Sequence, residues 1–193
     1  MDLFGNVADT SVRPAHAADA SALGEAQVRS WRETFKEHLS ATNFEQIQDQ
    51  LDADAFAAAW REAITHPPSP AHRVMAALAG PAVVGFAASV PAHFTTEETE
   101  PHALEIVALI VDPTHQKAGH GSRLLASCVD LSADEKPRYI TTWILAGEKP
   151  RERFFHEAGL RADGTYRKLT IGDEELTERR WSAKLDEGGD IAG

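Results

Sequence analysis

The segment from Ala103 to Leu125 constrains the fold more than any other part of the chain. It contains an apolar run, Ile106–Val111, that is typical of a buried strand. Asp112-Pro113 ends this strand, because proline cannot donate a hydrogen bond to a neighbouring strand. A loop with two glycines, Gly119 and Gly121, then leads into a segment with the apolar spacing of a helix. Such glycines let backbone N–H groups approach a ligand, and the start of a helix adds free amides and the positive end of its dipole. The segment therefore predicts an anion-binding strand–loop–helix unit.

Two familiar phosphate-binding loops do not fit this segment. A P-loop needs a lysine directly after its second glycine, but Ser122 follows Gly121. The dinucleotide-binding fingerprint needs a third glycine, and Leu124 stands at that position. The sequence therefore argues against an enzyme built on either loop.

Length and composition indicate one domain over residues 1–193, with residues 1–10 and 186–193 expected to be mobile tails. The formal net charge of −11 argues against a nucleic-acid surface. The single cysteine, Cys128, cannot form an internal disulfide and favours a reducing, cytoplasmic compartment. The apolar stretch Val74–Val90 is interrupted at Gly80-Pro81 and is shorter than the roughly 20 residues of a membrane span, so no membrane association is expected. The nine histidines are dispersed, and no metal site is predicted.

The apolar spacing predicts two helices, Ala18–Leu39 and Asn43–Thr65, ahead of the first hairpin. Two more helices are expected, at Gly119–Ser132 and between Pro150 and Gly159, because proline suits a first turn and glycine a left-handed cap. The strands expected from the pattern are Arg73–Leu78, Ala82–Val90, Leu104–Val111, Tyr139–Leu145, Thr165–Ile171 and Thr177–Leu185. This order of elements predicts a mixed α/β sheet.

The loop Gln116–Gly121 matches the pattern Q/R-x-x-G-x-G/A, and here the chain resembles the GNAT superfamily of acetyl-CoA-dependent N-acetyltransferases. In that family this loop holds the pyrophosphate of coenzyme A. Ser11–Ala15 resembles the family's first strand, Ala82–Ala87 its third strand, and Arg153–Leu160 its F-Y-x-x-x-G-F segment. Arg180-Trp181 stands where an Arg-Tyr often opens the last strand. The resemblance covers about residues 11–185.

The resemblance implies a mostly antiparallel, twisted sheet of about seven strands flanked by four helices, with acetyl-CoA as cosubstrate. Leu109, Ile110 and Val111 are expected to present backbone groups to the pantetheine and thioester. The other residues expected at the coenzyme are Gln116, Lys117, Ala118, Gly119, His120, Gly121, Ser122, Arg151, Phe154 and Phe155. Lys117, His120 and Arg123 are expected to give the loop local positive charge. Arg151 and Arg153 either reach a nucleotide phosphate or form a solvated helix face. Trp31 and Phe35 lie on the helix that lines the acceptor site in the family, although helical spacing also suits aromatic side chains in a core.

Acetyl transfer to an amine needs a neutral nucleophile, a stabilised oxyanion and a leaving thiol. Alkylamines, with a pKa of about 10.4, arrive protonated at neutral pH. Glu105 is the candidate general base, directly or through water, because it begins the strand that leads to the coenzyme loop. The alternative is a solvated carboxylate at a strand edge.

Two positions depart from the family's pattern. Phe155 stands where many relatives carry a tyrosine that protonates the departing thiolate, and phenylalanine has no donor. Water, Tyr166 or His156 would then have to supply that proton. Glu148 replaces an asparagine that often contacts the coenzyme.

The function that the sequence favours is direct acetyl transfer to a primary amine of a small molecule or peptide. A cysteine-bound intermediate is not expected, because Cys128 lies on the apolar side of its helix. The alternative is a catalytically weak module that binds or senses acyl-CoA. A homodimer is possible by analogy with the family.

Overall fold

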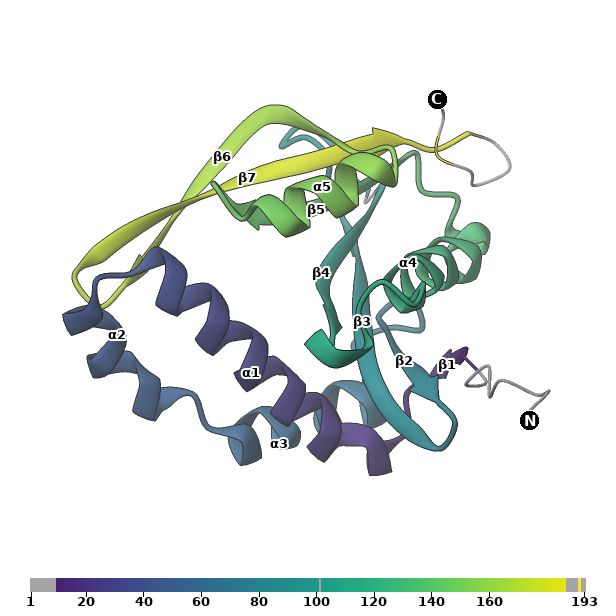
Figure 1. The fold of residues 1–193 in the computed structure, drawn as a ribbon. Helices are drawn as coiled ribbons and strands as arrows, with labels where there is room; N and C mark the ends of the chain where they lie inside the picture. Colours follow the sequence, from purple (N-terminus) through teal and green to yellow (C-terminus); the bar gives the residue numbers. More distant parts are fainter. Residues whose placement is uncertain (1–9, 101, 187–190, 192–193) are drawn as a thin grey trace, which may run out of the picture.

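The computed structural model describes residues 10–100, 102–186 and 191 of the chain. Within them, seven strands form one sheet in the order β1-β2-β3-β4-β5-β7-β6 (Figure 1). The strands are β1 (Thr10–Pro14), β2 (Arg73–Ala79), β3 (Ala82–Ala92), β4 (Ala103–Val111), β5 (Tyr139–Leu145), β6 (Arg161–Ile171) and β7 (Glu174–Lys184). Every neighbouring pair is antiparallel except β4 and β5. The predicted mixed sheet of about seven strands is confirmed.

The described residues contain five α-helices, whereas four were expected. They are α1 (Ala20–His38), α2 (Ala41–Ile47), α3 (Ala53–Thr65), α4 (His120–Leu131) and α5 (Lys149–Glu157). The predicted helix Asn43–Thr65 is wrong as one element, because the chain breaks between α2 and α3. The Asp52 carboxylate accepts hydrogen bonds from the amides of Asp54 and Ala55, and so caps the start of α3.

The helices cover opposite faces of the sheet and form separate cores. Leu124 of α4 and Phe155 of α5 belong to the first core, on one face. Leu23 of α1 packs with Phe86 of β3 in the second core, on the other face, where α3 also lies. The central strand β4 contributes to both cores, because successive side chains of a strand point to opposite faces.

A third core joins α1, α2 and α3 to the tip of the β6–β7 hairpin. Ile171 packs against this core, and its carbonyl accepts a 2.6 Å hydrogen bond from Nδ2 of the buried Asn43. At the same corner the Glu174 carboxylate accepts hydrogen bonds from the amide and hydroxyl of Ser40, the amide lying 3.1 Å from Oε1. The tip of the long hairpin is thereby fixed against the corner between α1 and α2, as Figure 1 shows.

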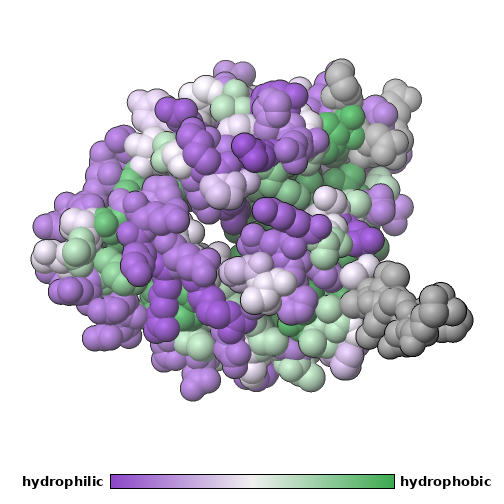
Figure 2. All heavy atoms as spheres, viewed as in Figure 1, coloured by the Kyte–Doolittle hydropathy of each residue, from purple (hydrophilic) through white to green (hydrophobic). Residues whose placement is uncertain are grey.

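This contact closes the molecule around a central opening. Figure 2 shows an opening near the centre of the space-filling view, with mainly hydrophilic residues around it. Comparison with Figure 1 places the opening between α1, α5 and β4.

The expected tails lie mostly outside the described residues, which include Thr10, Asp186 and Ile191 of them. Thr10 begins β1, and Ile191 forms a bridge with Leu185 and packs against the first core. None of the helices in the described part of the chain is long and apolar enough to span a membrane.

Candidate active site

The two parallel strands at the centre of the sheet diverge part of the way along their length. Pairing between β4 and β5 begins at Ala103 with Tyr139 and ends at Ile106 with Thr142. Beyond that point β4 continues to Val111 without a partner on this side. The second half of β4 therefore has an open edge, whose backbone groups are available to a ligand.

A β-bulge at Val107 marks the start of this divergence. Ile106 pairs with Ser89 of β3 and Ala108 with Ala88, so Val107 has no partner opposite it. Its side chain is 51% exposed, which is unusual for valine at the centre of a sheet. Because a bulge adds one residue, it changes which positions of the strand face a given side of the sheet. Before the bulge the even-numbered Leu104 and Ile106 face the first core, and after it the odd-numbered Leu109 does.

The open edge presents the backbone of Leu109 and Val111. The Leu109 carbonyl accepts a 3.3 Å hydrogen bond from Arg151 Nη1, and the Val111 carbonyl accepts one of 3.2 Å from Gln116 Nε2. Backbone groups alternate in direction along a strand, so those of Ile110, between them, face β3. Ile110, expected as a third backbone contact, instead pairs with Phe86 of β3 and packs in the second core.

The loop after β4 carries six consecutive amides that have no acceptor within the described part of the chain. They are the backbone N–H groups of residues 117–122. On either side the amides are paired: that of Gln116 with the Pro113 carbonyl, and that of Arg123 with the Gly119 carbonyl. Free amides at the start of a helix favour a bound anion. The residues predicted at the coenzyme from Gln116 to Ser122, which are Gln116, Lys117, Ala118, Gly119, His120, Gly121 and Ser122, form this one loop.

Two backbone conformations shape this amide loop. Gly119 caps α4 with φ of +82°, and Lys117 has φ of +62°. Both values lie in the left-handed region, where glycine is favoured and a side chain is strained. Gly121 serves a different purpose, since a Cβ atom there would lie 3.1 Å from Cε2 of Phe154. The absence of a side chain lets the first turn of α4 approach Phe154 of α5.

The positive charge of the loop comes from fewer residues than expected. His120 is only 2% exposed, its Nδ1 has no partner in the described structure, and burial is the main cause that lowers its pKa. The nearby charges of His115 and Arg123 lower that pKa further, so the imidazole is neutral at neutral pH. The expectation that His120 contributes positive charge is therefore wrong. Arg123 folds back over the loop, with Nη1 3.1 Å from the Ala118 carbonyl.

Glu105 lies near the bulge, on the face of the sheet that α1 covers. It pairs with Val90 of β3 and Thr141 of β5, and its side chain is half-buried. Leu104 and Ile106, on either side of it, belong to the first core, so Glu105 points to the opposite face. The carboxylate thus stands two residues before the bulge, close to where the open edge begins.

The position of the usual tyrosine is filled by a core residue. Phe155 is 1% exposed and packs edge-on against Phe154, with ring centroids 5.0 Å apart. Tyr166 does not replace the missing donor: it is exposed on β6, three strands away from β4, or about 14 Å at the usual strand spacing. His156 is exposed on α5 and does not reach the open edge through any contact in the described structure.

Two charged side chains at the start of α5, Glu148 and Arg151, lie between α1 and the open edge of β4. Arg151 donates a hydrogen bond to the Leu109 carbonyl, and the distance between its Nε atom and Oε2 of Glu148 is 3.7 Å. Glu148 also accepts a 3.5 Å hydrogen bond from Thr34 Oγ1 of α1. Burial is the main cause that raises the pKa of Glu148. Sequence reasoning left Arg151 either a phosphate contact or a place on a solvated helix face. It did not find Thr34, because the contact of Thr34 with Glu148 joins residues far apart in the chain.

The two aromatic residues proposed for the acceptor site lie elsewhere on α1. Phe35 is buried in the third core, and Trp31 packs edge-on against Phe56 of α3 with ring centroids 5.0 Å apart. These aromatic residues hold α1 against α3. The alternative interpretation of their helical spacing, as part of a core, therefore describes them. The face of α1 that meets the opening instead carries Thr34.

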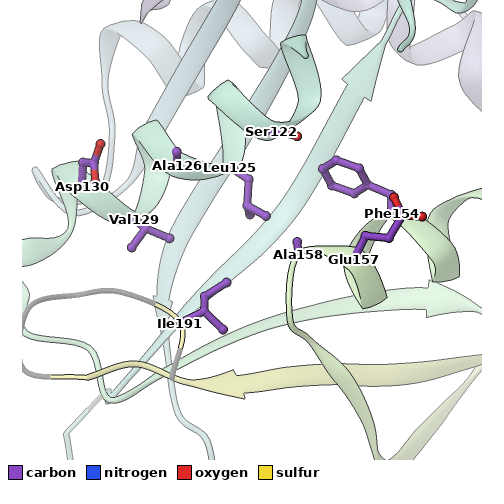
Figure 3. A pocket seen from close by; sticks show the side chains of 9 residues that line it. All are labelled: Ser122, Leu125, Ala126, Val129, Asp130, Phe154, Glu157, Ala158 and Ile191. Atoms are coloured by element: carbon purple, nitrogen blue, oxygen red, sulfur yellow. The ribbon is translucent and has the colours of Figure 1, made fainter. Parts of the chain in front are cut away.

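A pocket of about 350 Å³ lies next to the amide loop, between α4 and α5 (Figure 3). Ser122 stands at one end and Ile191 at the other. The remaining lining residues are Leu125, Ala126, Val129, Asp130, Phe154, Glu157 and Ala158. Neither Glu105 nor the open edge of β4 lines it, so this pocket adjoins the loop but is separate from the central opening.

The chemistry of the site rests on backbone amides and carboxylates. No group of three or more His, Cys, Asp or Glu side chains in the described ranges is arranged to hold a metal ion. Cys128 is buried in α4, and burial raises the pKa of its thiol to about 11. It is therefore not poised as a nucleophile.

The fold is that of known acetyltransferase structures. A putative acetyltransferase, YncA, from Salmonella typhimurium with its cofactor acetyl-CoA matches with a TM-score of 0.66 at 20% identity, over 93% of this chain and 95% of that one. A ribosomal-protein-alanine N-acetyltransferase from Brucella melitensis also has a TM-score of 0.66 at 20% identity, over 91% and 99%. PaiA N-acetyltransferase from Thermoplasma acidophilum, in complex with coenzyme A, gives 0.63 at 14% identity, over 88% and 98%.

The family follows from the sequence match. The model of the acetyltransferase (GNAT) family matches residues 26–160, more than two thirds of the chain. The chain belongs to the GNAT family of acetyltransferases, as its resemblance predicted, and is an acyltransferase by that membership. No curated protein matches it.

Proposed function

We propose that this protein transfers the acetyl group of acetyl-CoA directly to a primary amine of a small molecule or peptide. The observation that carries the proposal is the free-amide loop 117–122, which lies next to the open edge of β4. A diphosphate would pair with the free amides of the loop. An extended amide-containing arm would lie along Leu109 and Val111, and it would replace Arg151 and Gln116 as hydrogen-bond partners of their carbonyls.

The residues present fit coenzyme A. Gly121 leaves room for α4 to approach Phe154. Because Gly121 has no side chain, the diphosphate would meet backbone N–H groups there. Lys117 and Arg123 add positive charge around those amides. When bound, the coenzyme would supply an acetyl group activated as a thioester.

Glu105 is the proposed general base. It would take a proton from the incoming ammonium, through a water molecule, and so free the nitrogen lone pair. The N–C bond then forms, the C–S bond breaks, and the sulfur leaves as a thiolate. The acylated nitrogen gives up its second proton to water, which carries it to that thiolate. A backbone N–H of the open edge near Leu109 would stabilise the charge that develops on the acyl oxygen.

The leaving group needs no protein acid for the reaction to proceed. Phe155 has no proton to give, but a thiol with a pKa of about 8.5 leaves acceptably as a thiolate. Water then protonates it. We expect turnover to be slower than in an enzyme with a tyrosine donor, because general acid catalysis contributes about 10²–10⁴-fold.

Composition supports the proposed setting of this reaction. The net charge of −11 favours small cationic substrates over nucleic acid, and the single cysteine suits a reducing compartment such as the cytoplasm. The high pKa of the Cys128 thiol supports direct transfer over an acyl-cysteine intermediate.

The second candidate function is a coenzyme-binding module with weak activity. Two observations favour it: Phe155 lacks a donor, and the Arg151 guanidinium occupies the Leu109 carbonyl on the open edge. Such a module would bind acyl-CoA through the same loop without efficient transfer.

Thiol release tests the proposed reaction. Acetyl-CoA is mixed with the protein and a panel of amines, and free thiol is followed with a chromogenic disulfide. We expect release that depends on the amine, and a kcat about 100-fold lower in Glu105→Gln with the KM for acetyl-CoA unchanged, because the amide keeps the shape but cannot accept the proton.

The control for this test is Glu45→Gln, which removes an exposed carboxylate on α2. Thermal stabilisation by the coenzyme without amine-dependent release would support the binding module instead. Equal rates in wild type and Glu105→Gln would rule out Glu105 as the base.

A further inference from the structure

Glu148 is a buried carboxylate between α1 and α5, two of the elements that border the central opening, and the proposed reaction does not use it. Its side chain is 16% exposed and lies between α1 and α5. Arg151, its neighbour on α5, donates to the Leu109 carbonyl, so these contacts run from α1 to the open edge of β4. An acceptor that reaches the open edge of β4 from between α1 and α5 would therefore pass this carboxylate.

The negative charge of Glu148 has only weak partners. The Arg151 Nε atom is 3.7 Å from Oε2, beyond hydrogen-bond distance, and Thr34 Oγ1 is at the limit of 3.5 Å from Oε1. The other charged groups that face it are His38, which favours its ionised form, and Glu37, which opposes it. Burial outweighs these contributions and raises the pKa of Glu148. A buried carboxylate with such weak partners gains from a further cation.

The fold also limits the shape of an acceptor. The tip of the β6–β7 hairpin is fixed to α1 and α2 by Asn43 and Glu174, so the opening is ringed by protein instead of being an open groove. An acceptor that enters here must pass through an opening that protein surrounds, and a small amine or a slender chain end suits such an entrance.

We propose that Glu148 binds the ammonium group of a small cationic amine at the opening and makes this amine the preferred acceptor. This assignment rests on the proposed acetyl transfer, which it deepens. Glu148 is a specificity-determining residue here, and Glu105 remains the base. In this account Glu148 exchanges its weak contact with Arg151 for a direct charge-assisted hydrogen bond to the substrate.

Steady-state kinetics with two acceptors tests this assignment. One acceptor is an alkylamine, which is protonated at neutral pH, and the other is an arylamine, which is neutral. In Glu148→Gln we expect the KM for the alkylamine to rise at least tenfold, since a hydrogen bond to a charged group contributes about 1.5–3 kcal/mol. The KM values for the arylamine and for acetyl-CoA should not change. Glu148→Asp should restore part of the loss.

Two further readouts separate binding from a structural role. The alkylamine KM should rise as pH falls through the raised pKa of Glu148, and this dependence should vanish in Glu148→Gln. Thermal stability should stay the same or increase in that variant, because the buried charge costs stability. The matched control is Glu33→Gln, which removes an exposed carboxylate of α1 that makes no contact with Glu148 in the described structure.

The outcomes distinguish this assignment from the proposed activity. If wild-type protein acetylates no amine, the activity fails, and Glu148 is then tested by calorimetry of the alkylamine with the coenzyme-loaded protein. Alkylamine affinity that is equal in wild type and Glu148→Gln would overturn the assignment, in kinetics or in calorimetry. A change in acetyl-CoA affinity alone would also overturn it and make Glu148 a coenzyme contact.

Discussion

At the scale of single residues, the approach of α4 to α5 depends on the missing side chain at position 121. A Cβ atom there would lie 3.1 and 3.3 Å from two ring atoms of Phe154, tighter than ordinary contact. The free amides are aimed by this first turn, so a small shift in it moves the proposed diphosphate site. Gly121 thus links the packing of α4 against α5 to the proposed binding of the diphosphate.

We expect Gly121→Ala to weaken coenzyme A binding about tenfold, equivalent to about 1.4 kcal/mol. Its stability should change little, because the helix propensity gained, up to about 1 kcal/mol, offsets the cost of overpacking. Calorimetry with coenzyme A and thermal unfolding measure the two effects. Adding Phe154→Leu should restore affinity by removing the ring edge, and failure of that rescue would count against the steric explanation.

The charged residues of the site differ in how much of their behaviour the sequence reveals. Glu105 is recognisable because it lies near the start of a strand that leads into the loop. His120 is misread from sequence, since its charge depends on burial that only the folded chain defines. Glu148 and Thr34 are 114 residues apart, and no local pattern predicts their contact.

At the scale of elements, an ion pair ties β1 to the start of the helical segment that follows it. Arg13 donates two hydrogen bonds to Asp19, of 2.6 and 3.0 Å, and the His16 amide donates a third of 2.7 Å. The hydrogen bond from Arg13 is the main cause that lowers the pKa of Asp19. A lowered pKa in the folded state means that this contribution is complete above the ordinary value near 3.8 and is lost as pH falls through the folded value.

Asp19→Asn should therefore destabilise the protein by about 1.5–3 kcal/mol at neutral pH. The difference from wild type should shrink when the pH is lowered below about 4. Urea denaturation at several pH values measures both quantities. Asp49→Asn, at an exposed position after α2, provides the control and should show no such pH-dependent difference. A difference that stays constant down to acid pH would contradict the role of the ion pair.

The element boundaries show where a sequence pattern stops being informative. The break between α2 and α3 has a local signal in the capping residue Asp52, but continuous apolar spacing across it conceals the signal. The bulge at Val107 has no local signal in the sequence. The run Ile106–Val111 is apolar throughout, so its pattern does not show that the side chains change faces at the bulge. The hairpin turn at Gly80, with φ of +56°, was predictable because glycine and proline mark it directly.

At the scale of the whole molecule, the closed ring and the divergent strands arise from contacts between distant elements. Residues 40–43 meet the hairpin tip near 171–174, and β4 parts from β5 after four pairs. The sequence predicted the class of sheet and the loop chemistry, because these follow from local periodicity and turn residues. The enclosure of the opening is a tertiary property, and it is this enclosure that shapes the proposed choice of acceptor.

The central claim is that the amides of residues 117–122 bind the diphosphate of coenzyme A. The most direct measurement is a titration of ¹⁵N-labelled protein with coenzyme A, followed by amide NMR. We expect the largest shifts at these six amides, and little change there when pantetheine, which lacks the diphosphate, is added instead. Absence of binding, or coenzyme-induced shifts concentrated away from the loop and from the open edge of β4, would contradict it.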